Sequence, residues 1–342
     1  MRKRLLAVLL VLTMCVALFG CTQTPAPTQP VTEAPTEAPT QAPTEAPTEP
    51  ETTEPPEAGS NPLLYKVTDE DGDVVWLFGS IHVGTPEFYP LPDYVMNAFT
   101  QSEALAVEMD IIAAEKNPFA LTEAMTQMIY MDQTTISDHI TEELYTKAVE
   151  ILTQEGLYMS LYDMYEPVIW WNLIDNSMLA HTELDANLGI DRYLIDQAYQ
   201  SGKELLEVES ARFQFDLLAG FSEELQIFLL EQAVASYEVL DEGVAELEAM
   251  AQLWASGDEA AFEAYLAQED LEGLTEEELA LYEEYSNALI TSRNLSMTEY
   301  AEACLAEGKE VFICVGATHI VGEGAMAQLL EQAGYTVELI TE

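Results

Sequence analysis

Two histidines in the chain each follow an apolar run and a glycine. Val74–Phe78 leads into Gly79-Ser80-Ile81-His82, and Val311–Val315 leads into Gly316-Ala317-Thr318-His319. Each apolar run predicts a strand, and functional side chains gather at the carboxyl ends of strands in open α/β sheets. Glycine lets the backbone turn sharply there and leaves room for a ligand. One Gly-x-x-His alone arises readily by chance. The repeated motif predicts that His82 and His319 meet at one site.

Three carboxylates occupy similar positions. Glu108 ends a short apolar run, Glu209 follows a predicted strand, and Asp191 opens a predicted helix. Imidazole and carboxylate together suit Zn²⁺, Mn²⁺, Co²⁺ or Fe²⁺, and an open coordination position would activate water for hydrolysis. Because the chain contains many acidic residues, the alternative interpretation is that these three carboxylates cap helices or lie in solvated loops. Arg293 is either a buried counter-charge to the site or one member of a stabilising pair. The other histidines, His139 and His181, lack this setting and are expected at the surface or at helix ends.

The charge balance excludes whole classes of partner. Among 342 residues there are 62 acidic and 11 basic side chains, a formal net charge of −51. Such a chain repels nucleic-acid phosphates and anionic lipid headgroups, so we expect no nucleic-acid binding and no polybasic membrane docking. Because 49% of the residues are hydrophobic, the chain can still bury a large core.

The first 60 residues predict export and a spacer. Arg2-Lys3-Arg4 precedes an apolar run, 5–19, that spans only ~22 Å as a helix, short of the ~30 Å membrane core. Leu18-Phe19-Gly20-Cys21 resembles a bacterial lipobox, which predicts a signal peptide over 1–21 and a lipid on Cys21; a signal peptide cut elsewhere is the alternative. Residues 22–60 repeat Ala-Pro-Thr-Glu/Gln and predict an extended, unfolded stalk. Residues 61–342 remain as the folded domain.

The folded part reads as strands at both ends with helices between. An Asp-Gly pair between the first two strands is a strong hairpin signal. Thr141 predicts an N-cap, and Thr275-x-x-Glu278 a capping box. The remaining periodicities predict strands over 63–68, 74–78, 104–109, 203–208, 311–315 and 335–340, and helices over 93–101, 167–179, 191–200 and 322–333.

The stretch between Arg212 and Arg293 is acidic and contains no basic residue. Its apolar positions keep helical spacing, so we favour a solvated helical bundle over a cation-binding face. Cys304 falls in a predicted helix and Cys314 in a strand. A disulfide between them is open, but both are better interpreted as small buried residues.

Together these residues resemble the TraB/GumN family, which includes the animal Tiki proteins and is distantly similar to erythromycin esterase-like hydrolases. The resemblance covers nearly all of residues 63–341 in the family's order. It is carried by Trp76-Leu77-Phe78-Gly79-Ser80-Ile81-His82-Val83-Gly84, Leu105-Ala106-Val107-Glu108-Met109-Asp110, Gly189-Ile190-Asp191-Arg192-Tyr193-Leu194, Val208-Glu209-Ser210 with Gln214, Arg293-Asn294 and Val315-Gly316-Ala317-Thr318-His319-Ile320-Val321-Gly322.

The resemblance implies a fold and a set of roles. The fold is α/β, a central mixed sheet surrounded by helices, with the acidic stretch as a helical insert. Tiki proteins are membrane-tethered proteases supported by Mn²⁺ or Co²⁺. By that similarity His82 and His319 hold the metal or lie directly beside it. Glu108 and Glu209 act as carboxylate ligand or general base, with Glu108 as the preferred ligand, and Arg293 polarises a carbonyl or holds the substrate. Asp191 and Gln214 are secondary candidates.

Two functions follow from different classes. The first is an exported, lipid-anchored hydrolase that uses Mn²⁺, Co²⁺ or Zn²⁺ on an extracellular peptide or protein. The second is a non-catalytic surface lipoprotein that binds a peptide or another signal. A third alternative is a surface lipoprotein whose site has lost its function. The lipobox indicates a bacterium, the long stalk favours a Gram-positive one, and the lipid anchor would be the only membrane contact. The sequence leaves the oligomeric state open.

Overall fold

The computed structural model describes residues 59–341 apart from 269, 270 and 272. The predicted signal peptide, Cys21 and nearly all of the predicted stalk lie outside the described residues. Within the described part, no helix combines the length and the apolar character needed to cross a bilayer.

A six-stranded mixed sheet forms the centre of the fold, in the order β4-β3-β5-β2-β1-β6. Strands β2, β5, β3 and β4 are mutually parallel, whereas β1 is antiparallel to both of its neighbours. The carboxyl ends of these four strands therefore meet at one edge, and β6 runs in the same direction because it too is antiparallel to β1. The strands are β1 (Leu64–Thr68), β2 (Val74–Ser80), β3 (Ala104–Val107), β4 (Glu204–Glu207), β5 (Val311–Gly316) and β6 (Thr336–Ile340).

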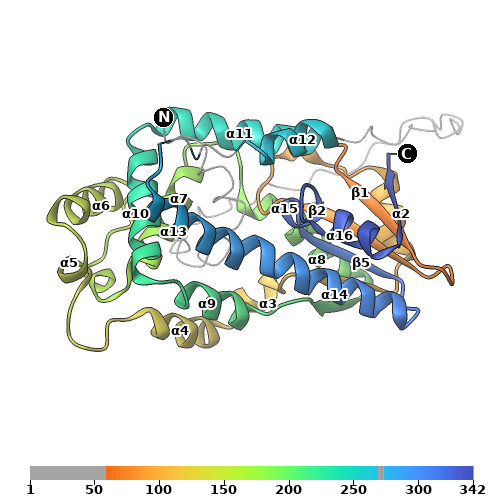
Figure 1. Cartoon of the computed structure of the whole chain (residues 1–342), viewed down its shortest axis with the longest axis horizontal. Coiled ribbons are helices and arrows are strands. Elements are labelled where there is room, and N and C mark those ends of the chain that lie inside the picture. The colour runs from red at the N-terminus through yellow and green to blue at the C-terminus, as the bar shows by residue number, and fades with distance from the viewer. Residues whose placement is uncertain (1–58, 269–270, 272, 342) are drawn as a thin grey trace, which may run out of the picture.

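Helices cover the sheet and build a second region beside it. Figure 1 shows the sheet at one end of the molecule, α6, α7, α10 and α13 at the other, and α14 running between them. The helices are α2 (Asp93–Gln101), α3 (Ile111–Glu115), α4 (Pro118–Met125), α5 (Ile136–His139), α6 (Glu142–Gln154), α7 (Pro167–Leu179), α8 (Ile190–Ser201), α9 (Ala211–Ala219), α10 (Glu223–Tyr237), α11 (Leu240–Ser256), α12 (Glu259–Leu266), α13 (Glu276–Ser286), α14 (Ser292–Ala306), α15 (Ala317–Ile320) and α16 (Met326–Ala333).

The predicted α/β class and the main elements are confirmed. The hairpin forms where Asp-Gly stands, with Gly72 at φ 92° and Asp69 Oδ1 accepting from the turn. Thr141 caps α6 through the Leu144 N–H, and Thr275 forms the capping box of α13.

Some boundaries were wrong, and several elements were not predicted. The helix predicted over 322–333 begins only at Met326, because Gly322 and Gly324 both adopt positive φ. Strand β3 ends at Val107, so the predicted run 104–109 leaves Glu108 just beyond the strand. The short helices α3, α4 and α5 carry no strong apolar period and were not foreseen.

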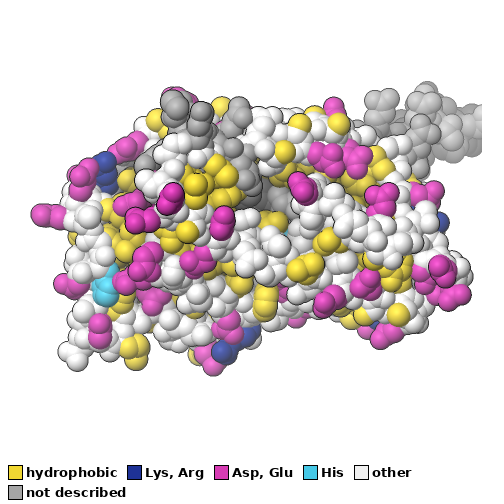
Figure 2. All heavy atoms as spheres, viewed as in Figure 1, with side chains coloured by type: hydrophobic (Ala, Val, Ile, Leu, Met, Phe, Trp, Pro, Cys, Tyr) yellow, Lys and Arg dark blue, Asp and Glu magenta, His cyan; other side chains and the backbone are white. Residues whose placement is uncertain are grey.

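The acidic stretch is helical, but only part of it is solvated. Helix α10 packs on α7, and its buried side chains include Leu225, Phe228 and Leu229. Figure 2 shows acidic side chains scattered widely over one face, with few basic ones between them. The stretch therefore puts its apolar residues into the core and its carboxylates on the surface.

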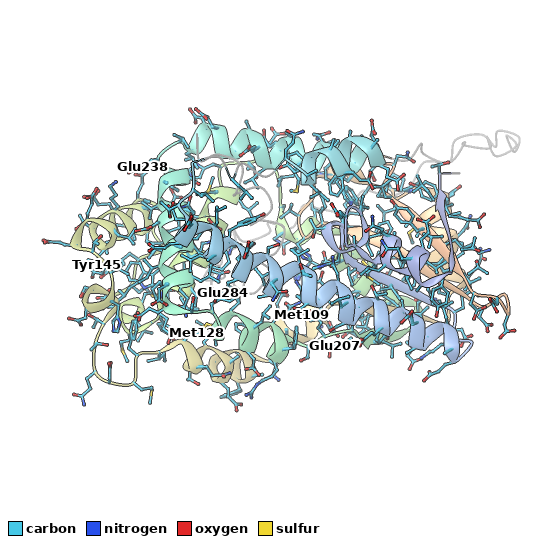
Figure 3. All side chains as sticks on the ribbon, viewed as in Figure 1. Met109, Met128, Tyr145, Glu207, Glu238 and Glu284 are labelled. Atoms are coloured by element: carbon cyan, nitrogen blue, oxygen red, sulfur yellow. The ribbon has the colours of Figure 1, made fainter. Side chains whose placement is uncertain are left out.

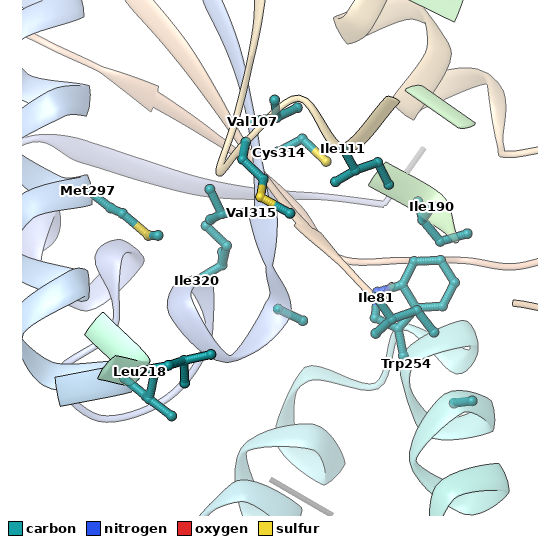
Figure 4. Packing of buried hydrophobic residues seen from close by; sticks show 14 of the residues in the cluster. Ile81, Val107, Ile111, Ile190, Leu218, Trp254, Met297, Cys314, Val315 and Ile320 are labelled. Carbon is teal, nitrogen blue, oxygen red and sulfur yellow. The ribbon is translucent and has the colours of Figure 1, made fainter. Parts of the chain in front are cut away.

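The core also holds the first histidine loop in place. Figure 4 shows Ile81 beside Trp254 of α11, whose indole Nε1 donates to the Gly79 carbonyl at 2.8 Å. Only glycine fits at position 79, because a Cβ there would lie 2.9 Å from the Ala317 Cα. The two histidine segments are thus packed directly against each other.

Candidate functional site

Arg293 lies at the centre of a buried ionic cluster. Its Nη2 donates to Glu108 Oε2 at 2.5 Å and to Glu209 Oε2 at 2.9 Å, and its Nε donates to Glu209 Oε1 at 2.7 Å. Its Nη1 donates to the Leu289 carbonyl at 3.2 Å. The Arg293 side chain is only 3% exposed. Of the five guanidinium N–H groups, one on Nη1 remains for another partner.

The two glutamates come from neighbouring strands. Glu108 follows β3 and Glu209 follows β4, and the backbone pairing of these strands continues to the Glu209 N–H, which donates to the Glu108 carbonyl at 3.0 Å. Gln214, on the first turns of α9, donates to both carboxylates. The Gly316 N–H donates to Glu108 Oε1 at 2.8 Å. All four carboxylate oxygens of the pair therefore accept a hydrogen bond from the protein.

Charge keeps Glu108 ionised despite its burial. Burial by itself raises the pKa of this carboxyl, but the Arg293 guanidinium, with contributions from His319, His82 and the Gly316 N–H, holds the pKa well below its usual range. The same neighbours act in return on Arg293: burial favours its neutral form, and the two glutamates outweigh that and raise the pKa of its guanidinium.

His82 is held beside Asp191, the first acidic residue of α8. His82 Nδ1 lies 3.1 Å from Asp191 Oδ2, an ion-pair distance at which the angle is not that of a hydrogen bond. Burial lowers the pKa of His82, but Asp191 and then Glu108 outweigh it, so the pKa is raised. Gly189 allows this approach, since a Cβ there would meet the His82 carbonyl oxygen at 2.5 Å.

His319 is fully buried, and its tautomer follows from the hydrogen bonds of Asn294. The Asn294 amide donates through Nδ2 to the Gly324 carbonyl at 2.9 Å, which turns its Oδ1 toward His319 Nδ1 at 2.7 Å. Because Oδ1 can only accept, Nδ1 carries the proton and Nε2 keeps its lone pair. Burial, followed by the charge of Arg293, lowers the pKa of His319 to about 3. Nε2 is buried and has no hydrogen-bond partner in the described residues.

A small cavity lies among these groups. It has a volume of about 30 Å³, which is room for only one or two waters. His82, Asp191, Glu108, Gln214 and Arg293 line it together with mostly apolar side chains, and His319 is not among its lining residues. Two glutamates around one guanidinium, with Asp191 beside His82, make the surroundings of this cavity negative overall, as a cation would require.

The fit to a divalent metal rests on donor atoms that have no partner. His319 Nε2 and Asp191 Oδ1 are buried and unpartnered in the described structure. Such nitrogen and oxygen donors suit Mn²⁺, Co²⁺ or Zn²⁺. Among the described residues, no three His, Cys, Asp or Glu side chains are already grouped around a common point. The donor chemistry therefore fits an ion, and the oxygens of Glu108 are already taken by Arg293, Gln214 and Gly316.

The structure brings together all the folded candidates that the sequence singled out: His82, Glu108, Asp191, Glu209, Gln214, Arg293 and His319. Sequence reasoning missed the role of Asn294, whose only signal was its place directly after Arg293. His139 and His181 end or follow helices and pair with Glu223 and Glu155, as expected for residues outside the site. Cys304 and Cys314 are buried and free.

The chain as a whole is similar to known proteins. The model of the TraB/PrgY/gumN family matches residues 63–339. The chain belongs to that family. It is also 26% identical over 260 residues to YbaP of Escherichia coli K12, covering 74% of this chain and 86% of that protein, and equally similar to YbaP of Shigella flexneri; both are described as uncharacterized. No solved structure matches the chain.

The ionic cluster predicts that Arg293→Met destabilises the fold near neutral pH. Removing the guanidinium leaves buried carboxylates without a counter-charge, so we expect a loss of about 3–5 kcal/mol in the free energy of unfolding near neutral pH. The control is Arg192→Met, which breaks a partly exposed pair with Glu115 and should cost about 0–1 kcal/mol.

The direction in which the stability of Arg293→Met changes with pH distinguishes buried unpaired carboxylates from a simple packing defect. In the wild type the pKa of Glu108 is lowered, so its stabilisation persists above the usual pKa and is lost only when pH falls through the depressed value. In Arg293→Met burial instead raises this pKa, and the variant should regain stability as pH falls from about 7 toward about 4.5. Urea unfolding across that range measures it; a constant deficit would contradict the account.

Proposed function

We propose that the protein is an exported metal-dependent hydrolase that cleaves a peptide or protein outside the cell. The observation that carries this proposal is the fixed, neutral His319, whose lone pair on Nε2 is buried without a partner. A histidine oriented by an amide and left with an unpartnered nitrogen has the arrangement of a metal ligand held by its neighbour. His82 and Asp191 are the other two residues that would hold Mn²⁺, Co²⁺ or Zn²⁺.

Such an ion supplies a Lewis acid, which polarises a carbonyl group and makes water a better nucleophile. Asp191 holds His82 through the ion-pair contact at Nδ1, and Asn294 orients His319 through a hydrogen bond. Arg293 fixes Glu108 and Glu209 beside the cavity and keeps one N–H for a substrate oxygen. The small cavity admits water but no substrate side chain, so a substrate would present its carbonyl at the mouth.

A second candidate is a binding lipoprotein without catalysis. The observation that favours it is the complete pairing of the Glu108 and Glu209 oxygens, which leaves neither carboxylate free as a general base in this arrangement. Binding of a peptide that is unaffected by a chelator would support this alternative.

The hydrolase is tested with the purified chain loaded in turn with Mn²⁺, Co²⁺ and Zn²⁺ and given a diverse peptide library. We expect cleavage that His82→Ala and His319→Ala lower by at least ~100-fold, since even a residue that only orients a ligand is worth ~10–100-fold. We expect Asn294→Leu to lower cleavage by ~10–100-fold, because Asn294 only orients His319. His181→Ala, a partly exposed histidine paired with Glu155, is the control and should cleave normally. Absence of cleavage with every metal would reject the hydrolase.

The extracellular location rests on the amino-terminal segment, whose Leu18-Phe19-Gly20-Cys21 would place a lipid on Cys21. In a bacterial host the wild type should incorporate labelled palmitate and sediment with membranes. Cys21→Ser should lose the label and accumulate as an unprocessed precursor. Equal labelling of Cys15→Ser and wild type is the matched control, and labelling of Cys21→Ser would contradict the anchor.

A further inference from the structure

A second and larger cavity opens beside the small one. Its volume is about 590 Å³, within the range of ~300–1,000 Å³ that is usual for ligand sites. Met109 lines both cavities and so stands at their junction. Figure 3 shows Met109 and Glu207 near each other; Glu207 ends β4, and Met109 follows the end of β3. A chain lying in the large cavity would therefore pass the mouth of the proposed hydrolytic site.

The lining of the large cavity suits a bulky apolar side chain. Its helical walls from α3, α4 and α9 present small side chains, which leave space that a larger residue would fill. Larger apolar residues, together with Tyr199, Asn117 and Ser210, complete the uncharged part of the lining. The alanines are Ala113, Ala114, Ala120, Ala124 and Ala211, and the larger residues are Met109, Leu205 and Phe215.

The charged groups of the cavity suit a cation. Asp110, Glu123 and Glu207 line it. Asp110 caps α3 and Glu207 accepts from the Asp110 N–H at 2.9 Å, so these two carboxylates are held in place. Arg212 also lines the cavity but pairs with Asp216 at 3.0 Å, outside the lining. The lining is thus negative overall, on a chain that is itself strongly acidic.

We propose that this cavity is the substrate-binding subsite, and that it takes a peptide segment with a large apolar side chain next to a lysine or arginine. This inference rests on the proposed hydrolase, for which it names the substrate class. The apolar side chain fills the space above the alanines, and the basic side chain lies along Asp110, Glu123 and Glu207. The peptide backbone then continues past Met109 to the small cavity.

Binding is measured by fluorescence anisotropy on the full chain carrying His82→Ala, so that cleavage does not interfere. Three labelled peptides are compared, with Lys-Phe-Lys, Glu-Phe-Glu or Lys-Ser-Lys at the centre of one neutral sequence. We expect the first to bind at least ~10-fold more tightly than either of the others, because only it combines apolar burial with opposite charge. The advantage over the Glu peptide should shrink with added salt.

Two variants in the same background locate the binding. Ala114→Trp fills the cavity and should weaken binding of the Lys-Phe-Lys peptide about tenfold or more. Glu123→Lys should weaken it several-fold and in a salt-dependent way; it also decides the question if Ala114→Trp fails to fold. The matched controls are Ala264→Trp on α12 and Glu150→Lys on α6, which are exposed and line neither cavity.

Equal affinity for the three peptides, or binding indifferent to both cavity variants, would overturn the subsite. Its failure is distinguishable from that of the hydrolase. If the selective binding holds and the wild type cleaves nothing with any metal, the hydrolase fails and the subsite stands. If the wild type cleaves peptides and Ala114→Trp and Glu123→Lys leave kcat/KM unchanged, the hydrolase stands and the subsite fails.

Discussion

The ion pairs of Arg293 with Glu108 and Glu209 are the interaction on which the rest of the site depends. Taking three charges out of water costs several kcal/mol each unless they are paired and hydrogen-bonded, and this cluster meets that condition at every carboxylate oxygen. The guanidinium comes from α14 and the carboxylates from the ends of β3 and β4. The cluster thereby ties a helix from late in the chain to the sheet edge where the histidines lie.

The topology of the sheet explains why the site residues lie close together. Four parallel strands end at one edge, and the residues that follow them supply His82, Glu108, Glu209 and His319. Helix α14 then delivers two neighbours with different tasks. Arg293 neutralises the carboxylates, while Asn294 fixes the tautomer of His319. The substrate subsite proposed above uses the same edge, because Asp110 and Glu207 also stand where β3 and β4 end.

Much of this could be predicted from the sequence, and the limits have physical reasons. Apolar runs followed by Gly-x-x-His located two strand ends, and the Asp-Gly turn located the hairpin, because these signals are local. The partners of Arg293 could not be derived from the local pattern alone, since Glu108 is 185 residues away and the chain offers many other acids. The role of Asn294 depends on a hydrogen bond to Gly324, a contact that no local pattern encodes. The larger cavity is lined in part by α3 and α4, which were not predicted because their apolar residues show only weak helical periodicity.

The central claim is that His82 and His319, far apart in the chain, form one cation site. It is tested most directly by titrating the metal-free protein with Co²⁺ and following the visible absorption of the bound ion, at moderate salt to suppress binding to surface carboxylates. The account predicts one Co²⁺ per chain with a nitrogen- and oxygen-ligated spectrum, lost in His82→Ala and in His319→Ala but kept in His181→Ala. A spectrum that is absent, or indifferent to both histidines, would contradict it.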